Sequence, residues 1–360
     1  MSGIHPGPIP SPAIRMKRRT RTARSAFGVG QTVSFLWWKF LFDATIRPMA
    51  IPADELQRYT DFSVELTRDL KSIAIPPDTI LWHYTSGSGL LGIIDSMSVF
   101  STHISCLNDT SEFRYSSVLF REALASLRGS YETDPIALAF LDAAVGYFAE
   151  NPDYPAYTSV NQFVACFSEE ENDLSQWRAY GGGENGYAVG FRARDLWGCE
   201  NSMLARVSYD ENLHRQLAKK AAEATVRFFL EGLAKCAPSE KAKWGEEFLE
   251  AWQRAISLVA PLVKDPAFAK ERECRIVKSI GPGDFAKLRF MQKGSLICRH
   301  LPLSPPLLMA TDPYRLPIAR IMVGPCRHPI ISRNSIETLL KQKGYPATLV
   351  SISKIPYQVT

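Results

Sequence analysis

A histidine beside a tyrosine and a threonine, His83-Tyr84-Thr85, is the first group of side chains whose chemistry suggests a site. It follows an apolar run at 80–82, which predicts a buried strand with His83 at its C-terminal end. A Ser/Gly turn comes next, in which Ser88 is expected to cap a short helix. This arrangement holds an imidazole at the mouth of a cleft. A histidine that forms a hydrogen bond inside the core gives the same pattern, so both interpretations stay open.

Two acids, Asp109 and Glu112, form a second group near the start of a predicted helix. They are about one helical turn apart, so their side chains share one face of that helix. Together they are candidates to orient a ligand or to take part in catalysis. The alternative is structural: Asn108 or Asp109 caps the helix, and Glu112 is an exposed partner.

The third group combines Ser168 with the segment that carries Trp177, Arg178 and Tyr180. An aromatic face beside a guanidinium can stack on a ring and hold an anion, which suits a nucleotide or phosphate ligand. An aromatic helix end that only packs against the core would look similar. The glycines at 181–183 match neither a P-loop nor the G-x-G-x-x-G pattern, so we interpret them as a loop.

Glu271 and Glu273, followed by Arg275, form the last group. The segment alternates in polarity and predicts a strand, on which residues two apart point to the same face. Two adjacent carboxylates repel each other unless a cation or a ligand needs them, and the repulsion raises the pKa of at least one. Structural ion pairs with Arg272 and Arg275 are the alternative.

The strands and helices that must position these groups alternate irregularly along the chain. Strands are expected at 80–82, 99–104, 162–168, 187–191, 203–209, in the last part of 268–277, at 318–323 and at 347–352. Helices are expected at 53–72, 135–150, 212–236, 239–263 and 331–343, with one more that ends near 128. The chain has more strands than a simple succession of βαβ units would contain. We therefore predict a single α+β domain at 49–360 with a central mixed or antiparallel sheet.

Residues 212–263 are predicted to form an inserted α-hairpin of two surface helices. Trp244, Phe248 and Trp252 recur in it at four-residue spacing, which places them on one helix face. We therefore expect these aromatic side chains to contribute to packing and not to a site.

The positive charge of the chain is concentrated at its N-terminus. The net charge is +5, but residues 1–48 hold eight basic residues and one acid, so residues 49–360 carry 34 basic and 36 acidic residues. This near-neutral body argues against a dedicated nucleic-acid-binding surface there. Seven cysteines without a C-x-x-C pair show neither a disulfide framework nor zinc spacing. Their number and spacing indicate reduced thiols in a cytoplasmic protein, and we expect no metal site.

The N-terminal segment 1–48 joins an arginine cluster to an uncharged run at 25–38. Basic residues before an apolar stretch resemble a signal peptide or a membrane anchor. The run is only 14 residues long, whereas a membrane span needs roughly 20. We expect a disordered basic tail without a transmembrane segment, or a true start at Met49. Attachment to a membrane surface is the alternative.

The four groups also resemble, in the same order, the signature of an uncharacterised bacterial family, domain of unknown function two-nine-seven-one. The sequence resembles that family in the blocks 82–85, 107–113, 166–168, 175–180, 271–275 and 324–325. The resemblance extends over about 80–357 and leaves the tail and the 212–263 hairpin poorly matched. The family label implies no activity.

More distantly, the run at 81–83, its Ser/Gly turn and the Gly-Ile-Ile at 92–94 resemble the opening motif of the ADP-ribosyltransferases. In that superfamily a strand-end histidine holds the nicotinamide-side ribose of NAD, and His83 matches it. A late glutamate, often within Glu-x-Glu, stabilises an oxocarbenium-like transition state. Glu273 matches that glutamate, with Glu271 as the leading acid. The middle aromatic motif of the superfamily has no clear match.

This second resemblance implies an ADP-ribosyltransferase-like fold and an NAD-consuming enzyme of bacterial defence or toxin type. Under it, Arg178 grips the diphosphate and Trp177 or Tyr180 stacks on a ring. Asp109 and Glu112 orient an acceptor, which would be an unidentified macromolecule. The remaining residues of the expected NAD-binding set are His83, Tyr84, Thr85, Ser168 and Glu271.

Two other functions fit the same residues. The main alternative is a non-enzymatic module that binds a nucleotide in the same cleft. Nuclease chemistry with His83, Asp109 and Glu112 is weaker, because metal-independent RNA cleavage needs a second base or a lysine and none has suitable spacing.

A chain that begins at Met49 is expected to fold and to melt within about a few degrees of the full chain, because residues 1–48 lack a complete hydrophobic period. Differential scanning calorimetry of both chains checks this. Insoluble protein from the shorter chain would show that residues 35–42 pack against the rest of the protein.

Overall fold

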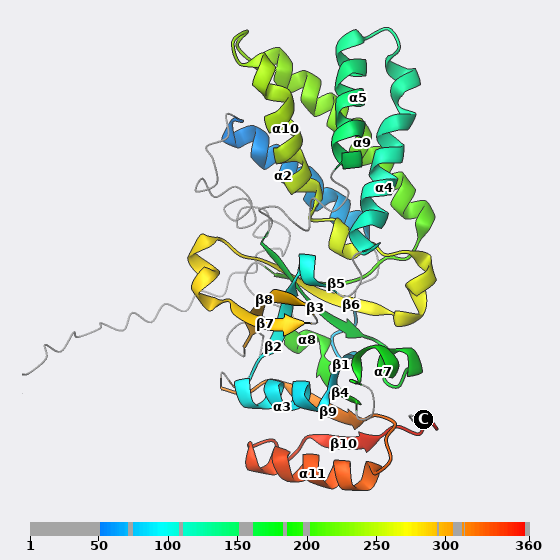
Figure 1. Ribbon diagram of the computed structural model, residues 1–360, viewed down its shortest axis with the longest axis vertical. Coiled ribbons are helices and arrows are strands. Elements are labelled where there is room, and N and C mark those ends of the chain that lie inside the picture. The colour runs from blue at the N-terminus through cyan, green and yellow to red at the C-terminus, as the bar shows by residue number, and fades with distance from the viewer. Residues whose placement is uncertain are drawn as a thin grey trace, which may run out of the picture.

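The strands of the described residues form one mixed sheet at the centre of the molecule (Figure 1). The computed structural model describes residues 51–70, 75–107, 111–150, 161–182, 186–196, 202–293, 295–304, 312 and 314–356. The strands are β1 (Ile80–Ser86), β2 (Val99–His103), β3 (Gln162–Ser168), β4 (Gly186–Arg192), β5 (Ser202–Arg206), β6 (Glu273–Ser279), β7 (Arg289–Lys293), β8 (Leu296–Leu303), β9 (Ile318–Val323) and β10 (Leu349–Ile352).

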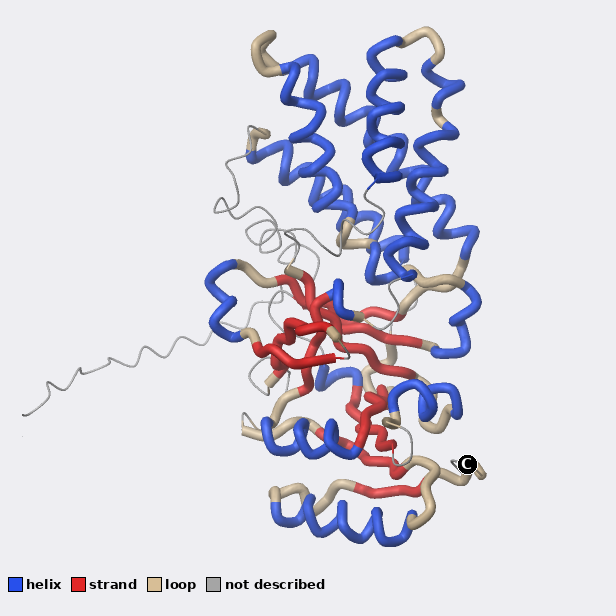
Figure 2. Tube along the Cα trace, in the orientation of Figure 1, coloured by secondary structure: helices blue, strands red, loops and turns tan. Residues whose placement is uncertain are grey.

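Helices lie at both ends of this sheet in the long direction of the molecule (Figure 2). The α-helices are α2 (Ala53–Leu70), α3 (Gly87–Ser96), α4 (Ser111–Ser126), α5 (Pro135–Glu150), α7 (Leu174–Tyr180), α8 (Ala193–Leu196), α9 (Glu211–Lys235), α10 (Lys241–Ile256) and α11 (Pro329–Gln342). Short 3₁₀ helices include η3 (Ala260–Leu262) and η4 (Pro266–Glu271). The predicted α+β class with a mixed sheet is confirmed.

The sheet divides into two halves that meet at β3. Strands follow the order β10-β9-β4-β1-β3-β2-β8-β7, and β6 pairs with both β3 and β5. The full length of β3 pairs with β6, from Gln162 with Ser279 to Ser168 with Glu273. The other edge of β3 is shared: β2 pairs near its start and β1 pairs only at Ser168. A gap therefore remains between β1 and β2 along this edge.

Strand β3 is buried on both faces, as its nearly continuous apolar sequence predicts. Val164 packs into the cluster under the helices, whereas Ala165 and Phe167 pack on the opposite face. The opposite face is covered by α3 and α11, through residues such as Leu90 and Leu340. Because side chains alternate along a strand, one apolar run serves two cores.

Helices α2, α4, α5, α9 and α10 form a layer on one side of the sheet (Figure 1). A cluster of aromatic side chains holds this helical layer together. The ring of Phe248 lies 5.5 Å from that of Tyr59 and 5.7 Å from those of Phe140 and Phe229. Trp244 and Trp252 on the same helix are also buried. Their predicted packing role is confirmed. One face of each of the two helices of the hairpin completes the core of this layer.

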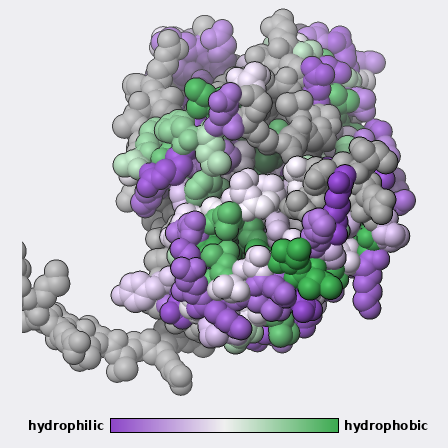
Figure 3. All heavy atoms as spheres, turned by 60° about the horizontal axis from the view of Figure 1, so that its bottom comes forward, coloured by the Kyte–Doolittle hydropathy of each residue, from purple (hydrophilic) through white to green (hydrophobic). Residues whose placement is uncertain are grey.

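The face formed by α3, β10 and α11 carries apolar patches between hydrophilic side chains (Figure 3). Exposed apolar residues on these elements include Leu91, Ile330, Ile331 and Leu349. In the described part of the chain, no helix combines the length and hydropathy that a membrane crossing requires.

Replacing Phe248 by Ala is expected to lower the free energy of unfolding by about 3–5 kcal/mol, because the fully buried ring leaves a cavity among its aromatic neighbours. Phe290→Ala is the matched control. Its ring is 66% exposed on β7, so the change should stay within about 0.5 kcal/mol. Urea unfolding followed by circular dichroism measures both, and equal effects would contradict the packing described for the helical layer.

Candidate functional site

A cleft of about 560 Å³ opens where β1 and β2 leave the middle of the β3 edge unpaired. Beyond the single pair of Trp82 with Ser168, β1 continues along β4 and diverges from β3. Strand β6 and the segment before it close the other side. The lining includes His83, Tyr84, Thr85, Cys166, Tyr180, Lys264, Glu271, Glu273 and Arg275.

His83 reaches across the gap to the unpaired stretch of β3. Its Nδ1 lies 2.9 Å from the carbonyl oxygen of Cys166. A carbonyl only accepts, so Nδ1 carries the proton and donates, which leaves Nε2 as an acceptor. Burial lowers the pKa of His83, although its hydrogen bond to Cys166 opposes that shift. The imidazole is therefore neutral at neutral pH.

The position of His83 within its strand differs from the prediction. Strand β1 does not end at the histidine but runs on to Ser86, with His83 opposite Val189 in the β4 ladder. The polar residues 83–86 remain extended because β4 supplies backbone partners. The helix cap also differs: Ser86, not Ser88, accepts from the amide of Gly89 at the start of α3.

A buried ion-pair network forms the opposite wall of the cleft. The guanidinium of Arg275 donates to both carboxylate oxygens of Glu273, with each N–O distance 2.8 Å. The Nζ of Lys264 lies 3.2 Å from Glu273 Oε2 and 2.6 Å from Glu271 Oε2. Arg275 also donates to the carbonyl of Pro261 at 2.9 Å. The four charges balance, so the network is neutral as a unit.

The Glu273 carboxylate stays ionised in this network although its side chain is buried. Burial alone would raise the pKa of Glu273, but the charge and hydrogen bonds of Arg275, with a smaller contribution from Lys264, outweigh burial. The pKa falls to about 2. A hydrogen bond from the Cys166 thiol acts in the same direction. The predicted repulsion between Glu271 and Glu273 is thus removed by a lysine between them.

Glu271 and Glu273 do not share a strand, in contrast to the prediction. Glu271 is the last residue of η4, and β6 begins at Glu273. Arg272 between them has a left-handed backbone with φ of 43°, which breaks the extended run. Both carboxylates still approach each other because Lys264 binds each of them.

The hydroxyls of two predicted binding residues, on β1 and β3, have structural partners at the cleft wall. The Tyr84 hydroxyl donates to the carbonyl of Glu170 at 2.6 Å. The Ser168 hydroxyl donates to the carbonyl of Glu271 at 2.7 Å, which ties the end of β3 to η4. Thr85 lines the cleft beside them.

The aromatic segment on α7 divides between core and cleft. Trp177 is buried, stands edge-on to the ring of Tyr84 and donates from its indole to Asn172. That position does not offer its ring to a ligand. Arg178 is exposed and lies outside the cleft lining. Tyr180 does line the cleft, and burial raises the pKa of its phenol, which stays protonated.

The predicted pair Asp109 and Glu112 is not placed with the other groups. Asp109 falls outside the described residues. Glu112 lies on α4, but its side chain is outside what the structure describes. Within the described ranges, no cluster of three or more His, Cys, Asp and Glu residues is suited to hold a metal ion.

Lys264 and Cys166 are the cleft residues whose importance the sequence analysis missed. Lys264 is only 3% exposed and is the cation shared by both glutamates. A lysine directly after the apolar residues 258–263 is a pattern that can indicate a buried cation. Cys166 acts through its backbone carbonyl, which no side-chain pattern reveals, and through its thiol, which donates to Glu273.

Comparison with known proteins gives a match to a family model over part of the chain. The family described as protein of unknown function (DUF2971) matches residues 176–276. This range holds Tyr180, Lys264, Glu271, Glu273 and Arg275, and it includes the helical hairpin that was expected to match poorly. It is shorter than the predicted extent. No curated protein and no solved structure matches the chain.

Replacing Glu273 by Gln should destabilise the protein by several kcal/mol at pH 7, because two buried cations lose a shared anion. Since the folded pKa of about 2 lies below the ordinary 4.5, the stabilisation is complete above about pH 4.5 and is lost as the pH falls toward 2. The difference in unfolding free energy between wild type and Glu273→Gln should therefore shrink over this interval.

Urea unfolding at pH 7, 5 and 3 measures this difference (about 3 kcal/mol at the top of the range). Glu271→Gln is the matched control, because Glu271 is more exposed and Lys264 keeps Glu273 as a partner. Equal losses in both variants, or a loss independent of pH, would contradict the network.

Proposed function

We propose that the cleft binds NAD or a closely similar nucleotide and promotes cleavage of the bond between nicotinamide and ribose. One observation carries the proposal: the same cleft is lined by His83, which has an acceptor nitrogen, and by the carboxylates of Glu271 and Glu273. A ribose offers hydroxyl donors, and its transition state for glycosidic cleavage carries positive charge. These groups complement both features.

In this proposal His83 positions the sugar. Its Nδ1 proton is held by the Cys166 carbonyl, so Nε2 can accept a hydrogen bond from a ribose hydroxyl. The lowered pKa keeps it neutral, and protonation at acidic pH would remove the acceptor. Tyr180 provides a neutral aromatic side chain on the same cleft.

The carboxylates act on the charge that develops during cleavage. The bond between C1′ and the nicotinamide nitrogen breaks, and its electron pair neutralises the departing pyridinium. The ribose gains oxocarbenium character until water or an acceptor nucleophile bonds to C1′ and releases a proton. An ionised carboxylate at Glu273, held by Arg275 and Lys264, is oriented in advance to stabilise that charge. Glu271 is the more accessible acid and is suited to orient the nucleophile.

The proposed reaction is that of the ADP-ribosyltransferases, to which the sequence motifs around His83 and Glu273 are similar. The order of the two residues along the chain supports it, and so does their presence on one cleft. Under this proposal the fold is ADP-ribosyltransferase-like. The acceptor would be a macromolecule, in a bacterial defence or toxin system in the cytoplasm.

Nucleotide binding without turnover is a second candidate, favoured by one observation. Both oxygens of Glu273 are already engaged by Arg275 and Lys264. A neutralised carboxylate stabilises a cation less well than a free one. The cleft could then hold a nucleotide through the same groups and leave its glycosidic bond intact.

Incubation of the purified full chain with NAD, with and without cell lysate, should release nicotinamide, measured by chromatography. His83→Ala should reduce the rate by a factor on the order of ten to a hundred, because ribose positioning is lost. Glu337→Gln, on the exposed face of α11, is the control and should leave the rate unchanged. Melting temperatures of all chains confirm that they are folded.

Two other results decide between the candidates. If calorimetry detects NAD binding that His83→Ala weakens, but no nicotinamide is released, the cleft is a binding module. If wild-type protein neither binds nor cleaves NAD, both candidates are rejected.

A further inference from the structure

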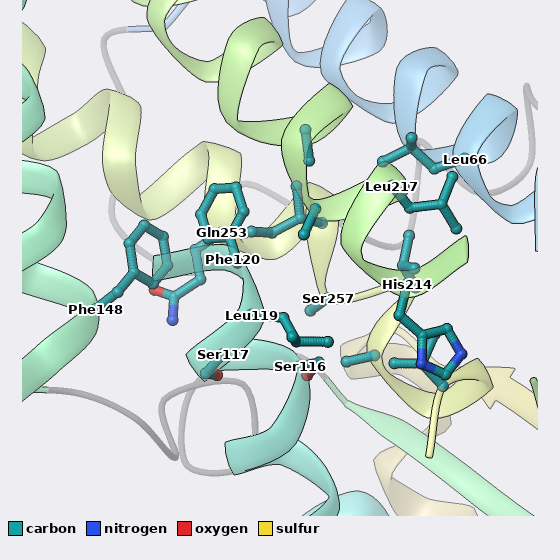
Figure 4. A pocket seen from close by; sticks show the side chains of 16 residues that line it. Leu66, Ser116, Ser117, Leu119, Phe120, Phe148, His214, Leu217, Gln253 and Ser257 are labelled. Atoms are coloured by element: carbon teal, nitrogen blue, oxygen red, sulfur yellow. The ribbon is translucent and has the colours of Figure 1, made fainter. Parts of the chain in front are cut away.

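A second pocket lies inside the helical layer (Figure 4) and shares no lining residue with the cleft. It is lined by α2, α4, α5, α9, α10 and the chain after α10, and its volume is about 80 Å³. Its walls are mainly aliphatic and aromatic, with Leu66, Leu119, Phe120, Phe148 and Leu217 among them.

One buried amide in this pocket has an unused donor. The side chain of Gln253 on α10 is 1% exposed. Its Oε1 accepts from the Tyr147 hydroxyl at 2.9 Å, which orients the amide. Its Nε2 has no hydrogen-bond partner. In Figure 4 the side chains of Gln253, Phe120 and Phe148 converge on the same part of the pocket.

An unpaired buried amide is costly, so its position in a pocket calls for an occupant. Other buried atoms without a partner, such as Trp252 Nε1 and Tyr59 Oη, belong to residues that do not line this space. Among the described residues with such an atom, Gln253 alone lines the pocket. An oxygen acceptor on a bound molecule would complete its hydrogen bonding.

The lining carries no charge to match an ionic ligand. Among the described lining residues the one titratable side chain is His214. Its ring nitrogens lie 2.9 Å from the hydroxyls of Tyr115 and Ser208, so both are engaged. Burial lowers its pKa despite nearby Asp210. The pocket therefore suits a neutral molecule and penalises an unpaired carboxylate.

We propose that this pocket is a binding site for a small, neutral, mainly apolar molecule with one oxygen acceptor, such as a ketone or an ester. The apolar part packs among Phe120, Phe148 and Leu217, and the acceptor takes a hydrogen bond from Gln253 Nε2. The site is separate from the proposed nucleotide cleft, and the inference does not depend on nucleotide binding.

Fluorine NMR of the full chain tests the site with three probes of similar shape. Para-fluoroacetophenone has the required acceptor, para-fluoroethylbenzene lacks it, and para-fluorobenzoate carries a charge. Titrations should show saturable binding of the ketone, about tenfold weaker binding of the hydrocarbon and no saturable binding of the benzoate.

Three variants assign the signal to the pocket. Gln253→Leu should reduce ketone affinity to that of the hydrocarbon, because only the acceptor contact is lost. Ala218→Phe, at a half-buried position of the lining, should block both probes. Gln162→Leu is the matched control: Gln162 is also buried with an unpartnered amide nitrogen but does not line the pocket, so ketone binding should persist.

Retention of the ketone preference in Gln253→Leu would overturn the proposal, and so would the absence of saturable binding to wild type, which would leave only water in the pocket. Circular dichroism melts check the fold of each variant. If Gln253→Leu is unfolded, Ala218→Phe decides: undiminished ketone binding to this variant rejects the site.

Discussion

The buried pair of Glu273 with Arg275 is the interaction on which the arrangement of the cleft depends. Arg275 is 1% exposed and satisfies its guanidinium with both oxygens of Glu273 and the carbonyl of Pro261. Arg275 thereby joins β6 of the sheet to η3, which follows α10 of the helical layer. Lys264 connects this pair to the end of η4, because it binds both Glu273 and Glu271. A buried pair of this kind stabilises little by itself, but breaking it strands a charge, so it specifies one packing.

The second constraint is a missing stretch of β-ladder. Strands β1 and β2 share one edge of β3 and leave its middle without a strand partner on that side. The His83 imidazole replaces a strand partner in this stretch, because its Nδ1 donates to the Cys166 carbonyl. A buried carbonyl needs a partner, so the break in the sheet both opens the cleft and sets the tautomer of His83. The orientation of the acceptor nitrogen of His83 is thus set by a backbone group and not by a neighbouring side chain.

Prediction from sequence succeeded where the determining pattern is local. The apolar run of β3 and the four-residue spacing of Phe248 and Trp252 report burial directly, because periodicity reflects how a strand or helix faces its neighbours. The strands around 99–104, 318–323 and 347–352 were also placed within a few residues. Whether a whole helix lies at the surface or forms part of a core was harder to predict. Helices α9 and α10 look amphipathic, which does not distinguish a surface hairpin from half of a helical core.

The sequence by itself determined the class of the fold and indicated several of the side chains that line the cleft, including His83, Tyr180, Glu271 and Glu273. Tertiary structure decided what these groups do. It extended β1 past His83 through pairing with β4, buried Trp177 against Tyr84 and put Lys264 between two glutamates. Each of these outcomes depends on residues distant in sequence. Hydrogen-bond partners, burial and neighbouring charges set a side chain's protonation and accessibility, and no local pattern encodes them.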